Sequence, residues 1–293
     1  SQVAEPLPSD SDLFSTTELK LERTKSGYVY EPFTVVGSDG REVIFEEPPD
    51  RIVVIDSSVL EILFAMGEGS RVVGTHSYAS YPPQVVNISK VGDAFDINIE
   101  DVVVLKPDLV FVFSPTFLEQ LKSVGIKVLY IQSLGDNFIN IVDNMRMWGR
   151  IVGNPISAEA MAVDFENRLK SIEDKLSHKI GGTSIFQDEG GLWSPGSGTL
   201  MNEVFNLLKL HNIAFDISGY GQLSPEVIVD RNPQIIIASY GDTISANPVF
   251  KELSAVKNAR VYVPNSDALS VAGPRFIEGI EEMAEWVYPG LFE

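Results

Sequence analysis

The chain repeats one short pattern in its two halves, and this repeat constrains the fold more than any other feature. Residues 98–114 read NIEDVVVLKPDLVFVFS, and residues 224–240 read SPEVIVDRNPQIIIASY. In each copy a glutamate opens a helical stretch, and a proline seven residues later precedes an apolar, β-branched run. Proline cannot continue a helix but tolerates the first position of a strand. The repeat therefore predicts two helix–stop–strand units, although two βα units of one α/β fold can also resemble each other by chance.

Short apolar runs around each copy predict further strands. Residues 51–55 form such a run, a capped helix is expected over 59–66, and a second run follows at 71–74. A strand, a helix and a strand over this distance make a βαβ unit, which implies a parallel sheet covered by helices. Each copy of the repeat is followed by one more apolar run, at 127–131 and at 260–263. Both halves of the chain are therefore predicted to be α/β.

One long helical segment lies between the two copies. Residues 157–177 run without glycine or proline, and roughly 21 residues of helix extend over ~30 Å. Apolar residues recur on one face of this segment, which would make it a stiff strut between two α/β halves. The predicted organisation is a flexible tether (1–26), an N-terminal lobe (27–153), a connecting helix (154–180) and a C-terminal lobe (181–293).

The N-terminal tether is rich in Ser, Pro and Glu and lacks periodicity until its end. Such a segment is expected in an exported protein whose leader has been removed, and equally at an arbitrary start of a chain. No apolar run in the sequence approaches the ~18 residues that span a bilayer.

The composition excludes several classes of function. With 22 Lys and Arg against 41 Asp and Glu, the net charge is −19, which argues against binding to nucleic acid or to an anionic membrane surface. The absence of cysteine removes thiol catalysis and iron–sulfur clusters. A three-imidazole metal site would need all of His76, His178 and His211. The last two follow predicted helices, where a cation suits the helix dipole, so only His76 is a candidate to face a cleft.

The sequence contains no recognisable catalytic motif. Neither a Gly-x-Gly-x-x-Gly nor a Walker-type loop is present, and residues 196–199 are expected to cap a helix. No Gly-x-Ser-x-Gly element marks a serine nucleophile. Asp188 and Glu189 could serve acid–base chemistry, but adjacent acids occur by chance in so acidic a chain. We therefore expect both to lie in a solvated loop.

Polar and aromatic residues recur where the predicted strands end. Parallel strands end at one edge of a sheet, and the ligands of open α/β folds bind beyond that edge. Two lobes facing each other across such edges would form an aromatic-lined cleft. The candidate ligand-binding residues are Ser57, Ser58, His76, Tyr78, Tyr81, Ser114 and Phe117 in the first half, and Gln187, Trp193, Tyr220, Tyr240 and Asp267 in the second.

Five motifs occur in an order that resembles a known family. They are Pro48–Ile55 (PPDRIVVI), Tyr81–Gln84 (YPPQ), Leu105–Val110 (LKPDLV), Gly125–Val128 (GIKV) and Gly273–Ile277 (GPRFI). Over about residues 30–290, the chain resembles the class III periplasmic solute-binding proteins of ABC importers for cobalamin, ferric siderophores and haem. The resemblance implies two Rossmann-like α/β lobes joined by one long interdomain helix, with the ligand cleft between the lobes.

The resemblance also implies a partner. Family members dock on a permease dimer through one surface glutamate in each lobe, which meets arginines. Glu226 is expected in that role in the second lobe and Glu119 in the first. Both also stand near helix starts, where the helix dipole by itself favours an acid.

The identity of the ligand stays open between several metal chelates. Asp267 matches an acid that lies near the ligand in cobalamin binders, and Tyr220 matches an aromatic position there. Arg275 is either a ligand contact, as in siderophore sites, or a structural residue. Ala268 and Val271 differ from the enterobacterial cobalamin binder, so corrinoid, ferric siderophore and haem all remain candidates.

The expected function is therefore not enzymatic. A receptor outside the cytoplasm, in the periplasm or at the cell surface, would capture a corrinoid or ferric chelate as a monomer, with no cofactor or metal of its own. It would deliver this ligand to an ABC permease and touch the membrane only through a possible N-terminal lipid anchor. The alternative is a doubly wound enzyme, such as a nitrogenase-like or nucleotide-dependent reductase, whose cluster thiolates and phosphate loop the chain lacks.

Overall fold

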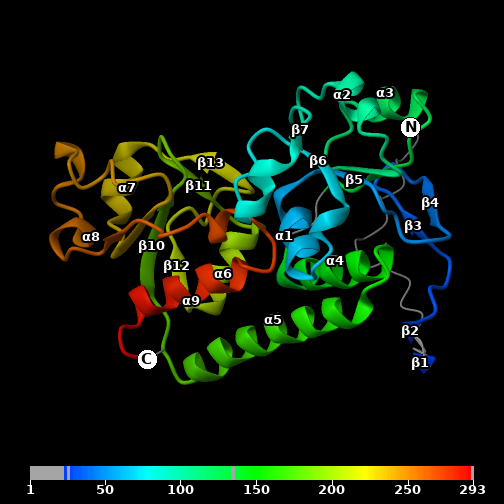
Figure 1. The fold of residues 1–293 in the computed structure, drawn as a ribbon. Helices are drawn as coiled ribbons and strands as arrows, with labels where there is room; N and C mark the ends of the chain where they lie inside the picture. Colours follow the sequence, from blue (N-terminus) through cyan, green and yellow to red (C-terminus); the bar gives the residue numbers. More distant parts are fainter. Residues whose placement is uncertain (1–22, 25–26, 133–135, 292–293) are drawn as a thin grey trace, which may run out of the picture. The chain divides into compact units, whose positions relative to one another are not determined.

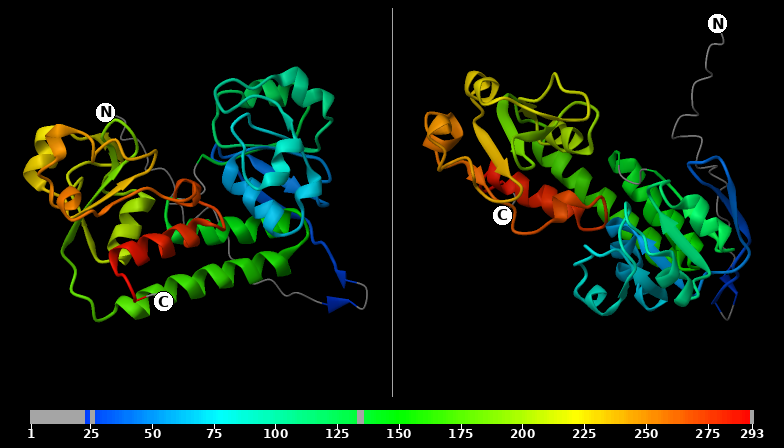
Figure 2. Two further views of the ribbon diagram at one scale, coloured as in Figure 1. Left: turned by 60° about the vertical axis from the view of Figure 1, so that its left-hand side comes forward. Right: turned by 90° about the horizontal axis from the view of Figure 1, so that it is seen from above.

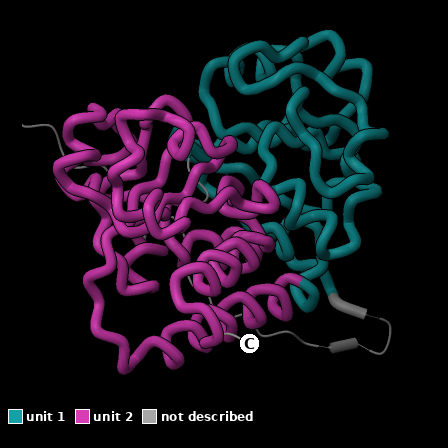
Figure 3. Tube along the Cα trace, turned by 90° about the vertical axis from the view of Figure 1, so that its left-hand side faces the viewer, with its two compact units in different colours: residues 1–133, 147–157 teal, residues 134–146, 158–293 magenta. Residues whose placement is uncertain are grey.

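The chain divides into two compact units, which Figure 3 shows in different colours. Unit 1 consists of residues 1–133 and 147–157, and unit 2 of residues 134–146 and 158–293. The structure, a computed structural model, describes residues 23–24, 27–132 and 136–291. Most of the expected tether, residues 1–22 and 25–26, lies outside the described residues.

Unit 1 is built on a parallel five-stranded sheet (Figure 1). Its strands, in spatial order, are β7 (Ser89–Lys90), β6 (Val72–Thr75), β5 (Ile52–Ile55), β8 (Leu109–Val112) and β9 (Val128–Tyr130). Its helices are α1 (Ser57–Ala65), α2 (Ile99–Val104) and α3 (Leu118–Ser123), with short 3₁₀ turns at Gly69–Arg71 and Pro83–Asn87. Two antiparallel pairs precede the sheet: β1 (Arg23–Thr24) with β2 (Gly27–Tyr28), and β3 (Phe33–Val36) with β4 (Glu42–Phe45).

Both faces of the unit 1 sheet are covered. Successive residues of a strand point to opposite sides of the sheet, so the two faces pack against different neighbours. Val110 and Val112 of β8 belong to one apolar cluster, to which α2 and α3 also contribute. Phe111, between them, faces the other way and meets Trp148 of α4 (Phe138–Ile151) edge-on, with ring centroids 5.3 Å apart. Strands buried on both faces explain the continuous apolar runs of the sequence.

Unit 2 holds a second parallel sheet. Its strands, in spatial order, are β12 (Leu210–Asn212), β10 (Thr183–Asp188), β14 (Ile235–Ala238) and β15 (Val261–Tyr262). Its helices are α6 (Leu200–Leu207), α7 (Pro225–Arg231), α8 (Ser254–Lys257) and α9 (Phe276–Val287), with 3₁₀ turns at Pro248–Phe250 and Ala268–Ser270. A separate antiparallel pair, β11 (Trp193–Pro195) with β13 (Tyr220–Gln222), was not expected from the sequence.

The structure confirms that both copies of the repeat are helix–stop–strand units. The first copy forms α2 and β8, and the second forms α7 and β14. Asn98 and Ser224 cap the two helices through their side chains. The residue before each proline, Lys106 in one copy and Asn232 in the other, is left-handed, with φ of 48° and 41°. The two copies therefore share their irregular turn as well as their regular elements.

The long helical segment is also confirmed. Helix α5 (Pro155–Leu176) has 22 residues, and its uninterrupted course is visible in the left view of Figure 2. Within unit 2, Arg168 of α5 forms two hydrogen bonds of 2.8 and 2.5 Å with Glu281 of α9, a paired geometry that fixes the two helices. Two of the divisions between the units fall inside α4 and α5. No helix in the described ranges combines the length and apolar character needed to cross a membrane.

Trp148 gives a direct test of the unit 1 core. Trp148→Ala is expected to lower the free energy of unfolding by about 3–5 kcal/mol, because a fully buried indole and its contact with Phe111 are lost. Trp148→Phe keeps much of the volume, and it removes an indole N–H that has no hydrogen-bond partner among the described residues. That variant should cost less than about 1.5 kcal/mol. Urea denaturation followed by circular dichroism measures both, and equal losses would contradict this packing.

Candidate functional site

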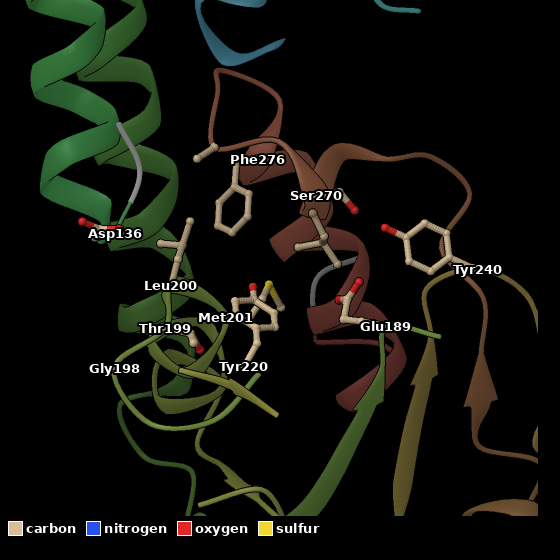
Figure 4. A pocket seen from close by; sticks show the side chains of 12 residues that line it. Asp136, Glu189, Gly198, Thr199, Leu200, Met201, Tyr220, Tyr240, Ser270 and Phe276 are labelled. Carbon is tan, nitrogen blue, oxygen red and sulfur yellow. The ribbon is translucent and has the colours of Figure 1, made fainter. Parts of the chain in front are cut away.

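A cavity of about 530 Å³ opens within unit 2, beyond the carboxyl end of its sheet. Figure 4 shows the side chains around it, with Glu189 and Tyr240 directed into the same space. The lining residues are Asp136, Glu189, Gly198, Thr199, Leu200, Met201, Tyr220, Tyr240, Leu269, Ser270, Ala272 and Phe276. Its volume lies within the range of small-molecule sites.

The register of two parallel strands brings the polar side of this cavity together. Strands β10 and β14 pair up to Asp188 opposite Ala238, so both end at the same level. The next residues, Glu189 and Ser239, therefore meet, and Ser239 Oγ donates a hydrogen bond of 3.1 Å to Glu189 Oε1. Gln187, two residues earlier in β10, donates from its Nε2 to the same oxygen. Two side-chain hydrogen bonds thus fix the position of Glu189 at the carboxyl end of the sheet.

The expectation that Asp188 and Glu189 lie in a solvated loop is wrong. Asp188 is only 3% exposed, and its Oδ1 accepts from the backbone N–H groups of Gly190 and Leu192, at 3.0 and 2.9 Å. It therefore stabilises the turn that leaves the sheet. Glu189 lines the cavity instead, and burial raises its pKa, followed by smaller opposing effects of its hydrogen bonds. Neighbouring acids thus have different environments because Asp188 ends a strand and Glu189 begins a turn.

Two tyrosines supply aromatic surface on the same side. Tyr220 stands on β13, and Tyr240 follows β14 in the chain. Burial raises the pKa of Tyr220, and the nearby groups Glu189 and Tyr240 raise it further. Each tyrosine combines an apolar ring with a hydroxyl that can donate or accept a hydrogen bond.

The opposite side of the cavity is mostly apolar. Leu200 and Met201 come from the first turn of α6, which Thr199 caps by accepting from the N–H of Asn202. Phe276 begins α9 and faces the cavity (Figure 4). The cavity therefore has one apolar wall and one wall of hydroxyl and carboxylate groups.

Four other predicted residues of unit 2 lie outside the cavity lining. Gln187 is 1% exposed and supports Glu189 from behind. Trp193 is 48% exposed on β11. Asp267 and Arg275 form an ion pair of 2.9 Å with each other. Of the expected residues in this unit, only Tyr220 and Tyr240 line the cavity.

Sequence reasoning missed Glu189, Thr199 and Phe276 as lining residues. The available signal for Glu189 was its position immediately after a strand, the same criterion that selected the tyrosines. Thr199 had been interpreted only as a helix cap, a role that it does fulfil. Phe276 belongs to the Gly273–Ile277 motif, from which only Arg275 was considered as a ligand contact.

In unit 1, the predicted polar residues gather at the corresponding edge of the sheet. Strands β5 and β6 are parallel neighbours, and Ser57 and His76 follow their ends. Ser57 Oγ lies 3.1 Å from His76 Nε2. Burial, helped by Lys90, lowers the pKa of His76 to about 4, so the imidazole is neutral at physiological pH. Ser58 is buried and donates to Asp56, the cap of α1, which leaves it structural.

The remaining predicted residues of unit 1 have mixed positions. Tyr78 and Tyr81 are 77% and 39% exposed, so both rings are accessible. Ser114 Oγ lies 2.8 Å from Thr116 Oγ1 in the turn after β8. Phe117 packs against the apolar cluster of unit 1, because it directly precedes α3, whose inner face contributes to the same cluster.

The two expected docking acids are both on the surface. Glu226 lies in the first turn of α7, and hydrogen bonds from its own backbone and from Ser224 hold its pKa below the ordinary value. Glu119 is 72% exposed, and its carboxylate lies 3.3 Å from Arg41. Helix dipole and local hydrogen bonding account for the stability of Glu226 as an anion.

The described residues contain no group of three or more His, Asp or Glu side chains that could hold a metal ion. His211 lies on β12 with its ring 5.6 Å from that of Phe215.

Comparisons with known proteins agree with this architecture. The model of the periplasmic binding protein family matches residues 52–268. An uncharacterized ABC transporter substrate-binding lipoprotein of Bacillus subtilis, YvrC, is 33% identical over 89% of this chain and 87% of its own length. A vitamin B12-binding protein of Vibrio cholerae is 28% identical over 82% of this chain and 90% of its own length. The crystal structure of the periplasmic vitamin B12-binding protein BtuF of Vibrio cholerae superposes with a TM-score of 0.72 at 28% identity, covering 82% of this chain and 97% of that one.

The family match and the two-lobed α/β relatives confirm the predicted fold class and favour transport over the enzyme alternative. Members of this family are components of transport systems. The chain therefore belongs to the periplasmic binding protein family, and it is an extracytoplasmic substrate-binding protein of an ABC transporter.

Proposed function

We propose that this protein captures a bulky metal chelate, a corrinoid in the first place, and delivers it to its ABC permease. The observation that carries the proposal is the unit 2 cavity, where Tyr220, Tyr240 and Phe276 gather beyond the edge of the sheet. The relatives from Vibrio cholerae that are described as vitamin B12-binding support a corrinoid over ferric siderophore or haem.

The physical basis is burial of a large, flat ligand against aromatic rings. Aromatic side chains offer large rigid surfaces at low entropic cost, and a few polar groups then fix the orientation. In unit 2 those polar groups are Glu189, Thr199, Ser270 and the two phenol hydroxyls. No bond of the ligand needs to change for this function.

Unit 1 contributes a second set of ligand contacts in this proposal. Its accessible candidates at the sheet edge are Ser57, His76, Tyr78 and Tyr81. His76 would meet the ligand as a neutral imidazole, since its surroundings disfavour the cation. Ser58 and Phe117 are left out of the proposed site because one is tied to Asp56 and the other packs in the core.

For permease docking, the repeat favours Glu100 over Glu119 as the partner of Glu226. Glu100 and Glu226 occupy the same place in the two copies, two residues after the caps Asn98 and Ser224. Both are exposed in the first turn of their helix. Glu119 belongs to α3, outside the repeat, and already pairs with Arg41. We propose Glu100 and Glu226 as the equivalent docking acids of units 1 and 2.

Ligand titration tests the proposed cargo. Cyanocobalamin at micromolar concentration is expected to quench the fluorescence of Trp193, and Trp193→Phe identifies that signal. Tyr220→Ala and Tyr240→Ala should each weaken binding by about 5–30-fold, because each removes a large contact surface. The matching Phe variants keep the rings and should lose less. Wild-type affinity in both Ala variants would contradict this site. Tighter binding of haemin or of a ferric siderophore than of cyanocobalamin would assign a different ligand to the protein.

The pH dependence of stability tests the environment of His76. Its pKa is about 4 in the folded protein against 6.5 as the ordinary value, so the unfolded chain binds the proton more readily. Stability from this group is present above about pH 6.5 and is lost as the pH falls towards 4. Wild type should therefore lose on the order of 1–3 kcal/mol more than His76→Gln over that interval. Parallel pH profiles for the two proteins, measured by urea denaturation, would show that His76 is not desolvated.

Charge reversal tests the docking acids. Glu100→Lys and Glu226→Lys are each expected to keep ligand affinity within about two-fold. Uptake by the cognate permease should fall at least ten-fold in each variant, because the ion pair that the acid forms with the permease becomes a repulsive contact. Glu173→Lys, an equal charge change on the exposed face of α5, serves as the control. Normal uptake with Glu100→Lys and impaired uptake with Glu119→Lys would assign unit 1 docking to Glu119 instead.

A further inference from the structure

The unit 2 cavity contains acidic side chains and no basic side chain among its lining residues. Its two carboxyl groups belong to Asp136 and Glu189, and no Lys, Arg or His is among the described residues that line it. The remaining polar groups are hydroxyls. An anionic ligand would therefore meet the Glu189 carboxylate with no basic side chain on the described cavity wall.

Glu189 is oriented by its neighbours but keeps one oxygen for a ligand. Ser239 Oγ and Gln187 Nε2 both donate to Oε1, and Gln187 Nε2 also lies 3.3 Å from Ser239 Oγ. Among the described residues, no hydrogen bond reaches Glu189 Oε2. Because Gln187 is 1% exposed, the clamp on Oε1 is built into the sheet edge and does not depend on mobile surface groups.

The basic residue that stands next to the lining in the sequence is paired with an acid outside the lining. Arg275 directly precedes the lining residue Phe276, but its guanidinium is engaged with Asp267 at 2.9 Å, and its side chain is only 11% exposed. The environment of Glu189 is correspondingly unfavourable for charge, since burial raises its pKa and the proximity of Glu189 raises that of Tyr220. Repulsion between like charges grows as water is excluded by a bound ligand.

We propose that Glu189 is a specificity-determining residue, which accepts a hydrogen bond from an N–H group of the ligand and excludes ligands that present carboxylate or catecholate anions to unit 2. This inference rests on the proposed capture of a chelate and narrows it. The cargo is then an uncharged or cationic chelate whose periphery carries N–H donors such as primary amides. The hydroxyls of Tyr220 and Tyr240 adapt to either donors or acceptors, so the discrimination comes from Glu189.

A matched pair of ligands isolates the effect of peripheral charge. Cyanocobalamin carries primary amides, and partial hydrolysis converts individual amides to carboxylates while the ring and metal stay the same. Wild-type protein is expected to bind the amide form at least ten-fold more tightly than the monocarboxylate mixture at pH 7.5, measured by fluorescence and by calorimetry. Equal affinity for the two forms would overturn the proposal.

A matched pair of variants isolates the effect of Glu189. Glu189→Gln removes the charge and keeps the shape, so the preference should shrink to about two-fold, chiefly through tighter binding of the carboxylate forms. Glu285→Gln makes the same change at an exposed position of α9 and should keep the wild-type preference. Ser239→Ala leaves the carboxylate but loosens its clamp, and it should weaken binding of the amide form while the carboxylate forms stay disfavoured. An unchanged preference in a folded Glu189→Gln protein, checked by its melting temperature, would overturn the role of this residue.

Failure of this inference can be told from failure of the proposed function. Preferential binding of haemin or of a ferric tris-catecholate, which are anionic, would keep chelate capture and overturn the charge selection. The protein could instead bind a cationic or neutral ferric hydroxamate more tightly than anionic chelates, and lose this preference in Glu189→Gln. That result would support the charge selection with a different cargo. Binding of none of these chelates would remove the proposed function and the inference together.

Discussion

The candidate site of unit 2 depends on the parallel register of β10 and β14. Because the two strands end level, residues about fifty positions apart in the sequence become neighbours at one edge of the sheet. Glu189, Ser239 and Tyr240 leave that edge together, and the turn after β10 is fixed by Asp188. A shift of one residue in the register would turn Glu189 to the other face and dissolve the hydrogen-bonded cluster. In unit 1, the neighbouring ends of the parallel strands β5 and β6 likewise bring Ser57 to His76.

Two acids that are adjacent in the sequence illustrate how burial divides structural from functional roles. A buried carboxylate is tolerated only when hydrogen bonds compensate the lost hydration. Asp188 obtains two backbone N–H donors from its own turn, and Glu189 obtains two side-chain donors that both reach one oxygen. In both acids the two donors reach a single oxygen. Of the two, Glu189 is the one that stands at the cavity wall, where a ligand can supply a further donor. The polar wall of the cavity thus has a free-energy reason to bind.

The sequence predicted what is encoded locally and missed what depends on distant pairing. Both helix–stop–strand units followed from a cap, a proline and a β-branched run, all within seventeen residues. The ladder between Trp193–Pro195 and Tyr220–Gln222 did not, since each strand has three residues, with proline or glycine among them. Glu189 was assigned to solvent because composition alone cannot show that Gln187 and Ser239 converge on it. Phe117 was assigned to the site because strand-end position does not reveal which way a side chain turns.

The two copies of the repeat reach one backbone geometry by different chemistry. Asn232 adopts the left-handed conformation readily, and its side chain accepts from the N–H of Ser254 at 2.8 Å. Lys106 pays a steric cost in the same conformation, and Arg51 compensates by donating to the carbonyls of Leu105 and Lys106 that end α2.

The residue after each proline then links the turn to the start of the neighbouring strand. Asp108 accepts from the backbone N–H of Arg51 at 3.0 Å, just before β5, and Gln234 accepts from that of Ser184 at 3.0 Å in β10. Different side chains therefore make the same connection in two halves that differ in sequence. What the two halves share is the placement of the helix start relative to the sheet. A surface acid carried on that helix start, such as Glu100 or Glu226, is consequently presented in an equivalent position on each unit.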